Sequence, residues 1–531
     1  MNVRQPCDAG VIAGSTAAPT PCPRATGMFV LAATILGSSM VFIDGTVVNI
    51  ALPVVQAELH ATAIDMQWVV NAYTLFLAAL MLVGGSLGDL YGRKLVFLIG
   101  TAIFTLASVW CGFTSDVHQL VLARGIQGMG SALLTPGSLA LISATFDKRQ
   151  RGAAIGTWSA FTTMTTAAGP ALGGLIVQYL SWRWIFFINV PLAIAVVAIT
   201  LIGVPESRED IAVRRLDVAG AALATLGLGA LTIGLVDAGT MGWGNGAVIA
   251  LLVGGVVALG AFIAVEARAS EPMMPLELFR SRTFSAVNLA TFLLYGALGA
   301  VLYLVPFDLI QIQHYTPTAA GLSIAPFVVL MVPLARWTGG MISRYGPKVF
   351  MLIGPAITAC GFALYALPGV GGSYWTTFFP AIVVVGLGMG LTVVPLTTAV
   401  LESVPTQHVG IASAINNAVS RSASLFAVAA ISVVMLGVFS AQLEGSIASM
   451  AAPPVSAHVA GEMLAQSDKL ADAQVPSDAP APAHAELSSA VVSSYVAAFR
   501  FAMLVGALLA LASVVITAFM LPGGRLLKED G

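Results

Sequence analysis

Stretches of about 20 predominantly apolar residues recur along nearly the whole chain, and each is long enough to cross the hydrocarbon core of a bilayer as a helix. Fourteen such stretches occur in the 531 residues. Charged residues make up only 9% of the chain, whereas an ordinary soluble domain carries about 25%. So few charges cannot form a water-exposed surface, and the sequence predicts an all-α integral membrane protein. The predicted spans lie near residues 28–52, 66–87, 94–114, 118–143, 153–178, 184–203, 217–236, 246–265, 284–311, 318–342, 347–367, 376–400, 408–438 and 493–521.

The lysines and arginines outside these spans indicate the orientation of the chain. An even number of spans places both termini on one side of the membrane. With that side taken as the cytoplasm, seventeen of these residues fall in inner segments and only two, Arg183 and Lys469, in outer ones. Inner loops of membrane proteins are enriched in Lys and Arg, so we expect both termini to be cytoplasmic.

An internal repeat indicates that the chain consists of two similar halves. Residues 84–94 end the second predicted span, and residues 339–348 end the tenth; both segments contain Gly-Gly, then Tyr-Gly and a following Lys. Both lie on the predicted cytoplasmic side, at the same place in each half once the spans near 217–236 and 246–265 are set aside. Two parallel six-helix halves are a known transporter design.

The repeat and the composition together predict the domain organisation. The outer segment 440–490 is rich in Ala, Pro and Ser, a composition that cannot bury a core, so we expect it to be mostly disordered. The predicted domains are a cytoplasmic tail (1–27), a six-helix bundle (28–203), a linker with two extra central helices (204–283), a second six-helix bundle (284–521) containing the outer loop, and a second cytoplasmic tail (522–531).

The loop that ends the second span carries Gly85, Asp89, Gly92, Arg93 and Lys94. It resembles the signature loop of the major facilitator superfamily, and the chain from about 28 to 521 resembles the fourteen-helix branch of drug:proton antiporters in that superfamily. The resemblance implies a gating loop in which Asp89 accepts hydrogen bonds from the facing half and latches one conformation. The family often has Arg at the position of Leu90. Alternatively, the loop is a charged turn that only follows the inner enrichment in basic residues.

The first span contains Asp44 within residues 42–53, a stretch that resembles the first-helix motif of the branch. A carboxylate inside a span costs about 2.5–3.5 kcal/mol, so it needs a partner or a wet cavity. The resemblance implies that Asp44 takes part in proton exchange. The alternative is a structural hydrogen bond to a neighbouring helix. Trp68 and Tyr73 in the second span also match the branch, and both are also typical of interface anchors.

The fourth span places Arg124, Gln127, Gly128 and Ser131 on one helix face, because they are three or four residues apart. This stretch resembles the proton-transfer motif of the family. A guanidinium stays charged in any environment, so Arg124 can bias a nearby carboxylate and respond when it is protonated. We expect Arg124 to take part in proton coupling and Gln127 to line the cavity. A buried ion pair that only fixes packing is the alternative.

The fifth span contains Gly169, Pro170, Gly173 and Gly174. The pattern matches the motif that the family associates with antiport, and it therefore implies export rather than import. Thr165 stands where the family usually has Gly. Small residues repeating every four positions let another helix approach closely, so packing alone explains the glycines equally well.

In the second half, Asp308 lies near the outer end of its span and is either a coupling or cation-binding acid or an ordinary interfacial one. Asn417 and Arg421 share one helix face in the thirteenth span. Arg421 lies midway along that span, so we expect both residues to line a cavity.

No catalytic cluster, metal-binding spacing or nucleotide-binding loop is visible, so the sequence predicts neither an enzyme nor an ATP-driven pump, and no cofactor or metal. The net charge of −2 implies no attraction to nucleic acid. The resemblance implies a secondary transporter in the bacterial inner membrane, acting as a monomer, that exports lipophilic, often cationic drugs or antibiotics in exchange for protons. Export of an endogenous secondary metabolite and uptake by the same fold remain alternatives. A channel or a receptor also remains possible, because fold does not determine function.

Overall fold

The computed structural model describes residues 24–208, 217–269, 272–405, 408–450, 456–477 and 479–522, and these ranges contain helices and no strand. The predicted tails at 1–27 and 522–531 lie almost wholly outside the described residues. The all-helical class predicted from the sequence is confirmed for the described ranges.

Thirteen helical stretches among the described residues are long and apolar enough to cross a membrane. They are α2 (Arg24–Glu58), α3 (Ala63–Tyr91), α4 (Arg93–Phe113), α6 (Lys148–Tyr179), α7 (Trp184–Phe187) with α8 (Asn189–Gly203), α9 (Val218–Met241), α10 (Gly246–Glu266), α11 (Arg282–Phe307) with the π-helix η2 (Asp308–Ile312), α12 (Pro317–Ser323) with α13 (Ala325–Tyr345), α14 (Pro347–Tyr365), α15 (Phe378–Glu402), α16 (Val409–Ala448) and α18 (Ala481–Met520).

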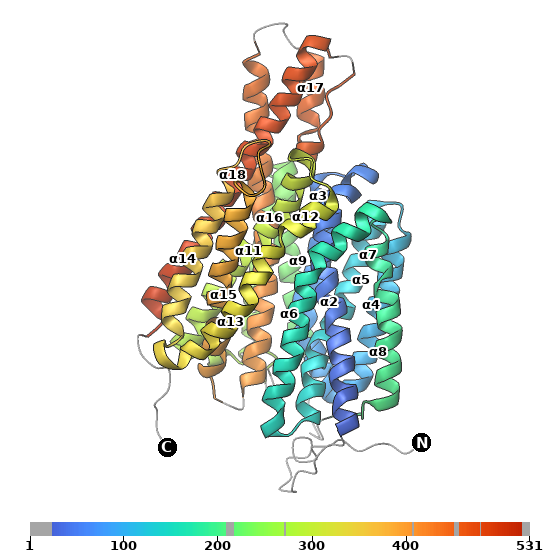
Figure 1. The fold of residues 1–531 in the computed structure, drawn as a ribbon, viewed down its shortest axis with the longest axis vertical. Coiled ribbons are helices and arrows are strands. Elements are labelled where there is room, and N and C mark those ends of the chain that lie inside the picture. The colour runs from blue at the N-terminus through green and yellow to red at the C-terminus, as the bar shows by residue number, and fades with distance from the viewer. Residues whose placement is uncertain are drawn as a thin grey trace. The chain divides into compact units, whose positions relative to one another are not determined.

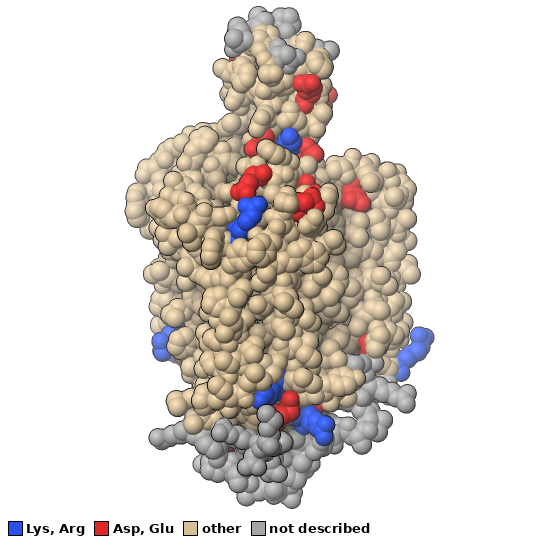
Figure 2. Space-filling view, turned by 90° about the vertical axis from the view of Figure 1, so that its right-hand side faces the viewer, with Lys and Arg blue, Asp and Glu red and all other residues tan. Residues whose placement is uncertain are grey.

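The remaining predicted span is helix α5 (Val117–Thr145), which carries Arg124 and Gln127 in its first half. Its 29 residues extend about 43 Å at 1.5 Å per residue, which exceeds the hydrocarbon thickness of about 30 Å. All fourteen predicted spans therefore correspond to helices. On the face shown in Figure 2, charged side chains gather toward the two ends and leave an uncharged band between them, as expected of a lipid-facing surface.

The helices form two compact units. Unit 1 comprises Met1–Asn49, Ala72–Gly229 and Val256–Leu276, and unit 2 comprises Ile50–Asn71, Ala230–Gly255 and Glu277–Gly531. The helices α2, α3, α9 and α10 each contribute residues to both units. The domains predicted from the sequence assign each span as a whole to one domain. They therefore do not predict that four helices contribute residues to both units.

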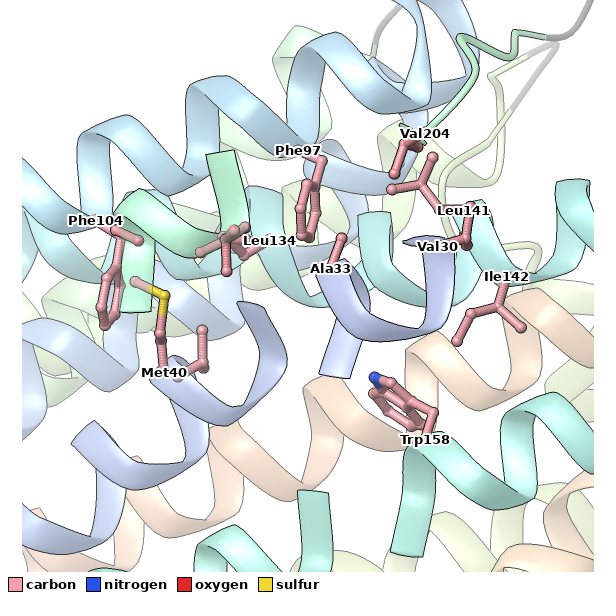
Figure 3. Packing of buried hydrophobic residues seen from close by; sticks show 14 of the residues in the cluster. Val30, Ala33, Met40, Phe97, Phe104, Leu134, Leu141, Ile142, Trp158 and Val204 are labelled. Atoms are coloured by element: carbon pink, nitrogen blue, oxygen red, sulfur yellow. The ribbon is translucent and has the colours of Figure 1, made fainter. Parts of the chain in front are cut away.

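Unit 1 is organised around aromatic and aliphatic side chains between α2, α3, α4, α5, α6 and α8, several of which are shown in Figure 3. Phe97 and Phe104 of α4 are fully buried there, and Trp158 enters the same cluster from α6. The Trp158 indole donates a hydrogen bond to Ser38 Oγ at 3.0 Å, and Ser38 Oγ donates to Ser138 Oγ at 2.9 Å. The polar groups inside this apolar core are thus paired, as burial requires.

Unit 2 contains two helices that are much longer than a membrane crossing requires. Helices α16 and α18 have 40 residues each, or about 60 Å, roughly twice the hydrocarbon thickness. Their far ends project together with α17 (Ala457–Ala465), and the 3-10 helix η4 (Ser467–Asp472) completes this extension (Figure 1).

The prediction that residues 440–490 are mostly disordered is wrong for the described part of that segment. Helix α16 continues to Ala448, and α18 begins at Ala481. The physical reason is that the extension buries its own apolar side chains, although Ala, Pro and Ser dominate its composition. Leu443, Met463 and Leu487 are completely buried there.

The two repeated loops have the same backbone feature, a single glycine with a positive φ angle. Gly92 is the single residue between α3 and α4, and Gly346 is the single residue between α13 and α14. Both have positive φ, 113° and 74°, a region that side chains disfavour. The following lysines also correspond, because Lys94 donates to Val204 O at the end of α8 and Lys348 donates to Ala518 O near the end of α18. These contacts support the internal repeat, since each lysine binds the carbonyl end of a later helix in its own unit.

Candidate functional site

Asp44 of α2 and Arg124 of α5 form an ion pair in the interior of unit 1. Arg124 Nη1 lies 2.5 Å from Asp44 Oδ2, and both side chains are almost completely buried. The sequence predicted a partner for Asp44 because a lone acid inside a span is costly. The structure brings together the two residues that the sequence assigned to proton coupling from separate motifs.

Gln127 joins this pair to further polar groups. It lies one turn after Arg124 and donates through Nε2 to Asp44 Oδ1 at 2.8 Å, while its Oε1 accepts from Arg124 Nη1 at 2.7 Å. The same Nε2 also donates to Ser108 Oγ of α4 at 3.2 Å, and Ser108 accepts from Asn189 Nδ2 of α8 at 2.9 Å. The site therefore draws on four helices. Ser108 and Asn189 carry no motif, and only their polarity inside spans could have marked them.

The Arg124 guanidinium lies over the ring of Tyr73 of α3, 4.1 Å from its centroid. This geometry is a cation–π contact, which is strengthened when the cation is shielded from water. The Tyr73 hydroxyl accepts a hydrogen bond from Ser131 Oγ at 3.0 Å. Tyr73 is buried, so its interpretation as an interface anchor is wrong, because the ring packs against the charge instead.

This cluster has the chemical means to exist in two charge states. In this arrangement, the negative charge of one carboxylate balances the positive charge of one guanidinium in an interior shielded from water. A proton on Asp44 would neutralise the carboxylate and leave the charge of Arg124 uncompensated, which is costly when buried. Protonation of this one side chain can therefore favour a rearrangement of the cluster.

The predicted antiport glycines lie against the helix that carries Asp44. A methyl group at Gly169 of α6 would collide with Thr46 of α2, and one at Gly173 would press against Val47. One turn earlier, Thr165 Oγ1 lies 3.1 Å from Ser39 Oγ of α2. The close helix approach predicted from this pattern is confirmed for Thr165, Gly169 and Gly173. Pro170 lies inside α6, which continues through it.

The gating loop forms its own ion pair inside unit 1. Arg93 donates to Asp89 Oδ1 through Nε at 3.0 Å and through Nη2 at 2.8 Å. The tight approach to the neighbouring helix falls at Gly84, where a methyl group would collide with the Ala132 backbone, and not at Gly85, where there is room.

Glu206 is a site residue that the sequence analysis missed. Its carboxylate accepts hydrogen bonds from the backbone N–H groups of Lys94 at 2.9 Å and Leu95 at 3.1 Å, at the start of α4. A carboxylate at this position satisfies free N–H groups and opposes the positive end of the helix dipole. A methyl group at Gly92 would press against the same carboxylate. Glu206 follows the end of α8 by three residues, and nothing in its local sequence distinguishes it from an ordinary loop acid.

Asp308 of unit 2 is buried where helix α11 turns into η2. Its side-chain oxygen accepts one weak hydrogen bond, from Gln313 Nε2 at 3.4 Å, and it interacts electrostatically with the phenols of Tyr365 and Tyr495. No lysine or arginine of the described residues pairs with it. Asp308 is 3% exposed, so it is not an ordinary interfacial acid facing water. A π-helical turn is frequent at functional sites.

The predicted cavity residues of α16 differ in their surroundings. Asn417 is exposed, and its Nδ2 donates to Ser413 O of its own helix at 3.0 Å. Arg421 is partly buried and interacts electrostatically with Tyr295 of α11. The neighbouring Asn416, by contrast, donates to Asn288 Oδ1 at 3.0 Å and to Thr291 Oγ1 at 2.9 Å, so it ties α16 to α11. The role of Asn417 and Arg421 in lining a cavity stays a prediction.

Residues 34–428 match the model of the Major Facilitator Superfamily. The chain is 34% identical to the multidrug resistance protein Stp of Mycobacterium tuberculosis, over 83% of this chain and 82% of that protein. It is 33% identical to the tetracenomycin C resistance and export protein of Streptomyces glaucescens, over 76% of this chain and 75% of that protein. It is 34% identical to the puromycin resistance protein pur8 of Streptomyces alboniger, over 83% of this chain and 88% of that protein.

Solved structures share the fold at low sequence identity. A bacterial homologue of the human lysosomal transporter Spinster, in an inward-facing and occupied conformation, superposes with a TM-score of 0.60 at 16% identity, over 93% of this chain and 96% of that one. A peptide transporter in complex with sulfate gives 0.59 at 14% identity, over 94% and 96%. Together with the family match and the curated relatives, these likenesses establish that the chain is a multi-pass membrane protein belonging to the Major Facilitator Superfamily.

Proposed function

We propose that this protein exports lipophilic, often cationic compounds, antibiotics among them, in exchange for protons, and that it acts as a monomer in the bacterial inner membrane with both termini in the cytoplasm. The observation that carries the proposal is the buried cluster of Asp44, Arg124 and Gln127, packed on the helix against which Gly169 is wedged. Because α2 carries Asp44 of the charge pair and also contacts these glycines, we expect this helix to move when the pair changes its charge.

The coupling follows from the cost of buried charge. With Asp44 ionised, the pair with Arg124 is neutral overall and stable in the interior. A proton from outside neutralises Asp44 and leaves the charge of Arg124 uncompensated. The conformation in which the two are paired is then no longer favoured over one in which Arg124 contacts water or another acceptor. Membrane potential adds about 2.3 kcal/mol per charge for each 100 mV.

Asp308 is the second acid in this proposal. It is buried in unit 2, and no lysine or arginine of the described ranges pairs with it. A carboxyl group in such a place is tolerated best in its neutral form. It can therefore carry a proton without leaving a cation uncompensated. Asp89, Gly92, Arg93 and Lys94 then serve as the gate whose geometry Glu206 holds.

An exporter of an endogenous secondary metabolite is the alternative that a specific observation favours. A relative that matches over three quarters of this chain is named for both resistance to and export of tetracenomycin C. The same coupling machinery would serve either role. The difference lies in the substrate, which the described residues do not identify.

The test uses everted membrane vesicles that hold the protein, with an acidic interior and a pH-sensitive dye. Lipophilic cations, antibiotics and microbial secondary metabolites are added in turn, and release of protons from the lumen is recorded for each. We expect release with at least one lipophilic cation. Vesicles with the Asp44→Asn variant serve as the control.

Proton release with a secondary metabolite alone would favour the narrow exporter. Proton movement in the same direction as the compound would indicate uptake and overturn the antiport proposal. No release with any compound, in vesicles shown to contain folded protein, would also contradict proton-coupled export of drugs.

A further inference from the structure

A small cavity lies in unit 2 next to the α16–α18 extension. Its volume is about 30 Å³, and its walls come from the ends of α2, α3, α9 and α11, from η2 and η4, and from within α16 and α18. This is room for one or two water molecules and not for a drug, since one water needs about 10–15 Å³ by this measure.

Polar groups without protein partners face this cavity. Ser432 Oγ and the Tyr495 hydroxyl line it, are shielded from solvent, and have no hydrogen-bond partner among the described residues. The amides of Gln56, Gln67 and Gln311 also border it. Buried polar groups that lack protein partners are ordinarily satisfied by water, so this cavity fits water rather than an apolar void.

The cavity reaches the neighbourhood of Asp308. Phe307 precedes Asp308 directly, and Gln311 follows it by three residues; both line the cavity. Tyr495 lines the cavity as well and interacts electrostatically with the Asp308 carboxyl. The Tyr495 phenol thus lines the space that fits water and is near enough to the buried acid to interact with it electrostatically.

Helix η4 covers the cavity on the extension side. Leu470 of η4 lines the cavity and is 9% exposed, although its backbone has φ 54° and ψ −120°. Side chains other than glycine disfavour this region, so contacts around Leu470 hold it there. One such contact is the hydrogen bond from Gln56 Nε2 to Lys469 O at 3.3 Å, and Gln56 Oε1 accepts from Gln311 Nε2 at 3.1 Å.

Helix η4 also brings charged side chains to the cavity. Asp468 and Lys469 line the cavity. Burial raises the pKa of Asp472 above its ordinary value, against the opposing effect of Lys469 and His60. Asp472 is the last residue of η4, and His60, two residues after the end of α2, is near enough to interact with it electrostatically.

We propose that this cavity is a water-filled entrance through which protons reach Asp308 from the side of the α16–α18 extension, and that η4 is its lid, with Leu470 as the plug. The inference rests on the proposed function in one respect, namely that Asp308 carries a proton. The entrance and its lid do not depend on which compound is exported.

The first experiment measures access to the cavity without using transport. Ser432→Cys is introduced into a chain whose four native cysteines have been replaced, and an impermeant methanethiosulfonate reagent is added to right-side-out or inverted vesicles. We expect slow labelling from right-side-out vesicles only. Leu470→Ala should raise that rate about tenfold, because it lowers the free energy of local opening. Met463→Ala, which shortens a buried side chain of α17 outside the cavity lining, should leave it unchanged.

A second variant keeps the test independent of the folding of Leu470→Ala. Gln56→Leu removes the hydrogen bond to Lys469 O and should raise the same labelling rate. Equal rates in the parent, Leu470→Ala and Gln56→Leu proteins would overturn the lid. Faster labelling from inverted vesicles would overturn the entrance.

The second measurement concerns Asp308 itself. A water-soluble carbodiimide is added from the extension side, and modification of Asp308 is measured by mass spectrometry. We expect more modification in Leu470→Ala than in Met463→Ala. Equal modification in the two would overturn the route to Asp308. If modification rises as expected while Asp308→Asn keeps full proton-coupled export, the entrance stands and the proposed role of Asp308 as a proton carrier fails.

Discussion

The two buried acids of this protein lie in opposite electrostatic surroundings. Asp44 of unit 1 faces the guanidinium of Arg124 at 2.5 Å and the amide of Gln127 at 2.8 Å. Asp308 of unit 2 has one weak hydrogen bond from Gln313 and no lysine or arginine partner among the described residues. Both carboxyl groups are shielded from solvent, so burial alone does not distinguish them.

Two acids inside spans can therefore serve the proposed transport cycle in different ways. A paired acid is bound to its partner. A change in its charge therefore alters the interactions of the partner and of the residues that contact the partner. An unpaired buried acid is tolerated best in its neutral form, so it can hold a proton without leaving a cation uncompensated. We therefore assign conformational coupling to Asp44 and proton carriage to Asp308, and each of the following predictions tests that division.

The largest effect is expected for Asp44→Asn. It leaves Arg124 buried without a carboxylate, and breaking one partner of a buried pair costs about 3–5 kcal/mol. We expect a lower unfolding temperature of the purified protein in detergent and loss of proton release from vesicles.

The matched control combines Asp44→Asn with Arg124→Met. Removing both charges should restore most of the lost stability but not the transport, because an apolar replacement of the whole pair leaves no uncompensated charge. A single variant as stable as the parent would mean that the ion pair has no structural role.

The next effect is expected for Asp308→Asn, and it concerns transport rather than stability. No cation in the described part of the chain pairs with this carboxylate, so the free energy of unfolding should change by less than about 1 kcal/mol. Proton release should be lost, while binding of substrate, measured by quenching of tryptophan fluorescence, should persist. Glu402→Gln, at the end of α15 in the same unit, is the control and should keep the coupling. A large loss of stability in Asp308→Asn would show that the two acids are alike.

A smaller effect is expected for Gly169→Ala, which tests whether the helix of Asp44 needs its close neighbour. The added methyl group collides with Thr46, and overpacking of this kind costs about 1–3 kcal/mol. Transport should slow in proportion. Gly156→Ala in the same helix meets nothing within 4 Å and should be neutral or slightly stabilising. Equal unfolding temperatures of the two variants would contradict a requirement for close packing between Gly169 and α2.

The smallest effect is expected in α16, where two adjacent asparagines differ. Asn416→Ala loses two hydrogen bonds to α11, and each is worth about 1 kcal/mol. Asn417→Ala loses only a bond within its own helix and should leave stability unchanged. If Asn417 lines the cavity, its loss should weaken substrate binding several-fold in the same fluorescence assay. Unchanged binding would remove it from the site.

Much of this molecule could be predicted from the sequence because its solvent is lipid. Each span must be helical and about 20 residues long, and the fourteen predicted spans correspond to helices within a few residues at most ends. The face shared by Arg124, Gln127 and Ser131 follows from helical spacing. The approach of another helix to Gly169 and Gly173 follows from the absence of side chains there.

Other features could not be predicted, because they depend on residues distant in the chain. Glu206 lies more than one hundred residues from Lys94, whose N–H group it binds. Tyr73 has an aromatic side chain typical of either an interface or a core, and only the position of Arg124 decides between them. The order of residues 440–490 depends on the burial of Leu443, Met463 and Leu487, and composition alone does not show that burial.

Hydropathy and repeated motifs are local properties, so the amino-acid sequence predicts a bundle of membrane-spanning helices with two related halves. It also marks Asp44, Arg124 and Asp308, because charge inside a span is costly wherever it lies. The three-dimensional arrangement is needed to show which of these acids is paired, what packs against the helix of Asp44, and what covers the cavity beside Asp308. Those answers depend on distances between helices, and a distance between distant residues is a property of the fold rather than of any one segment.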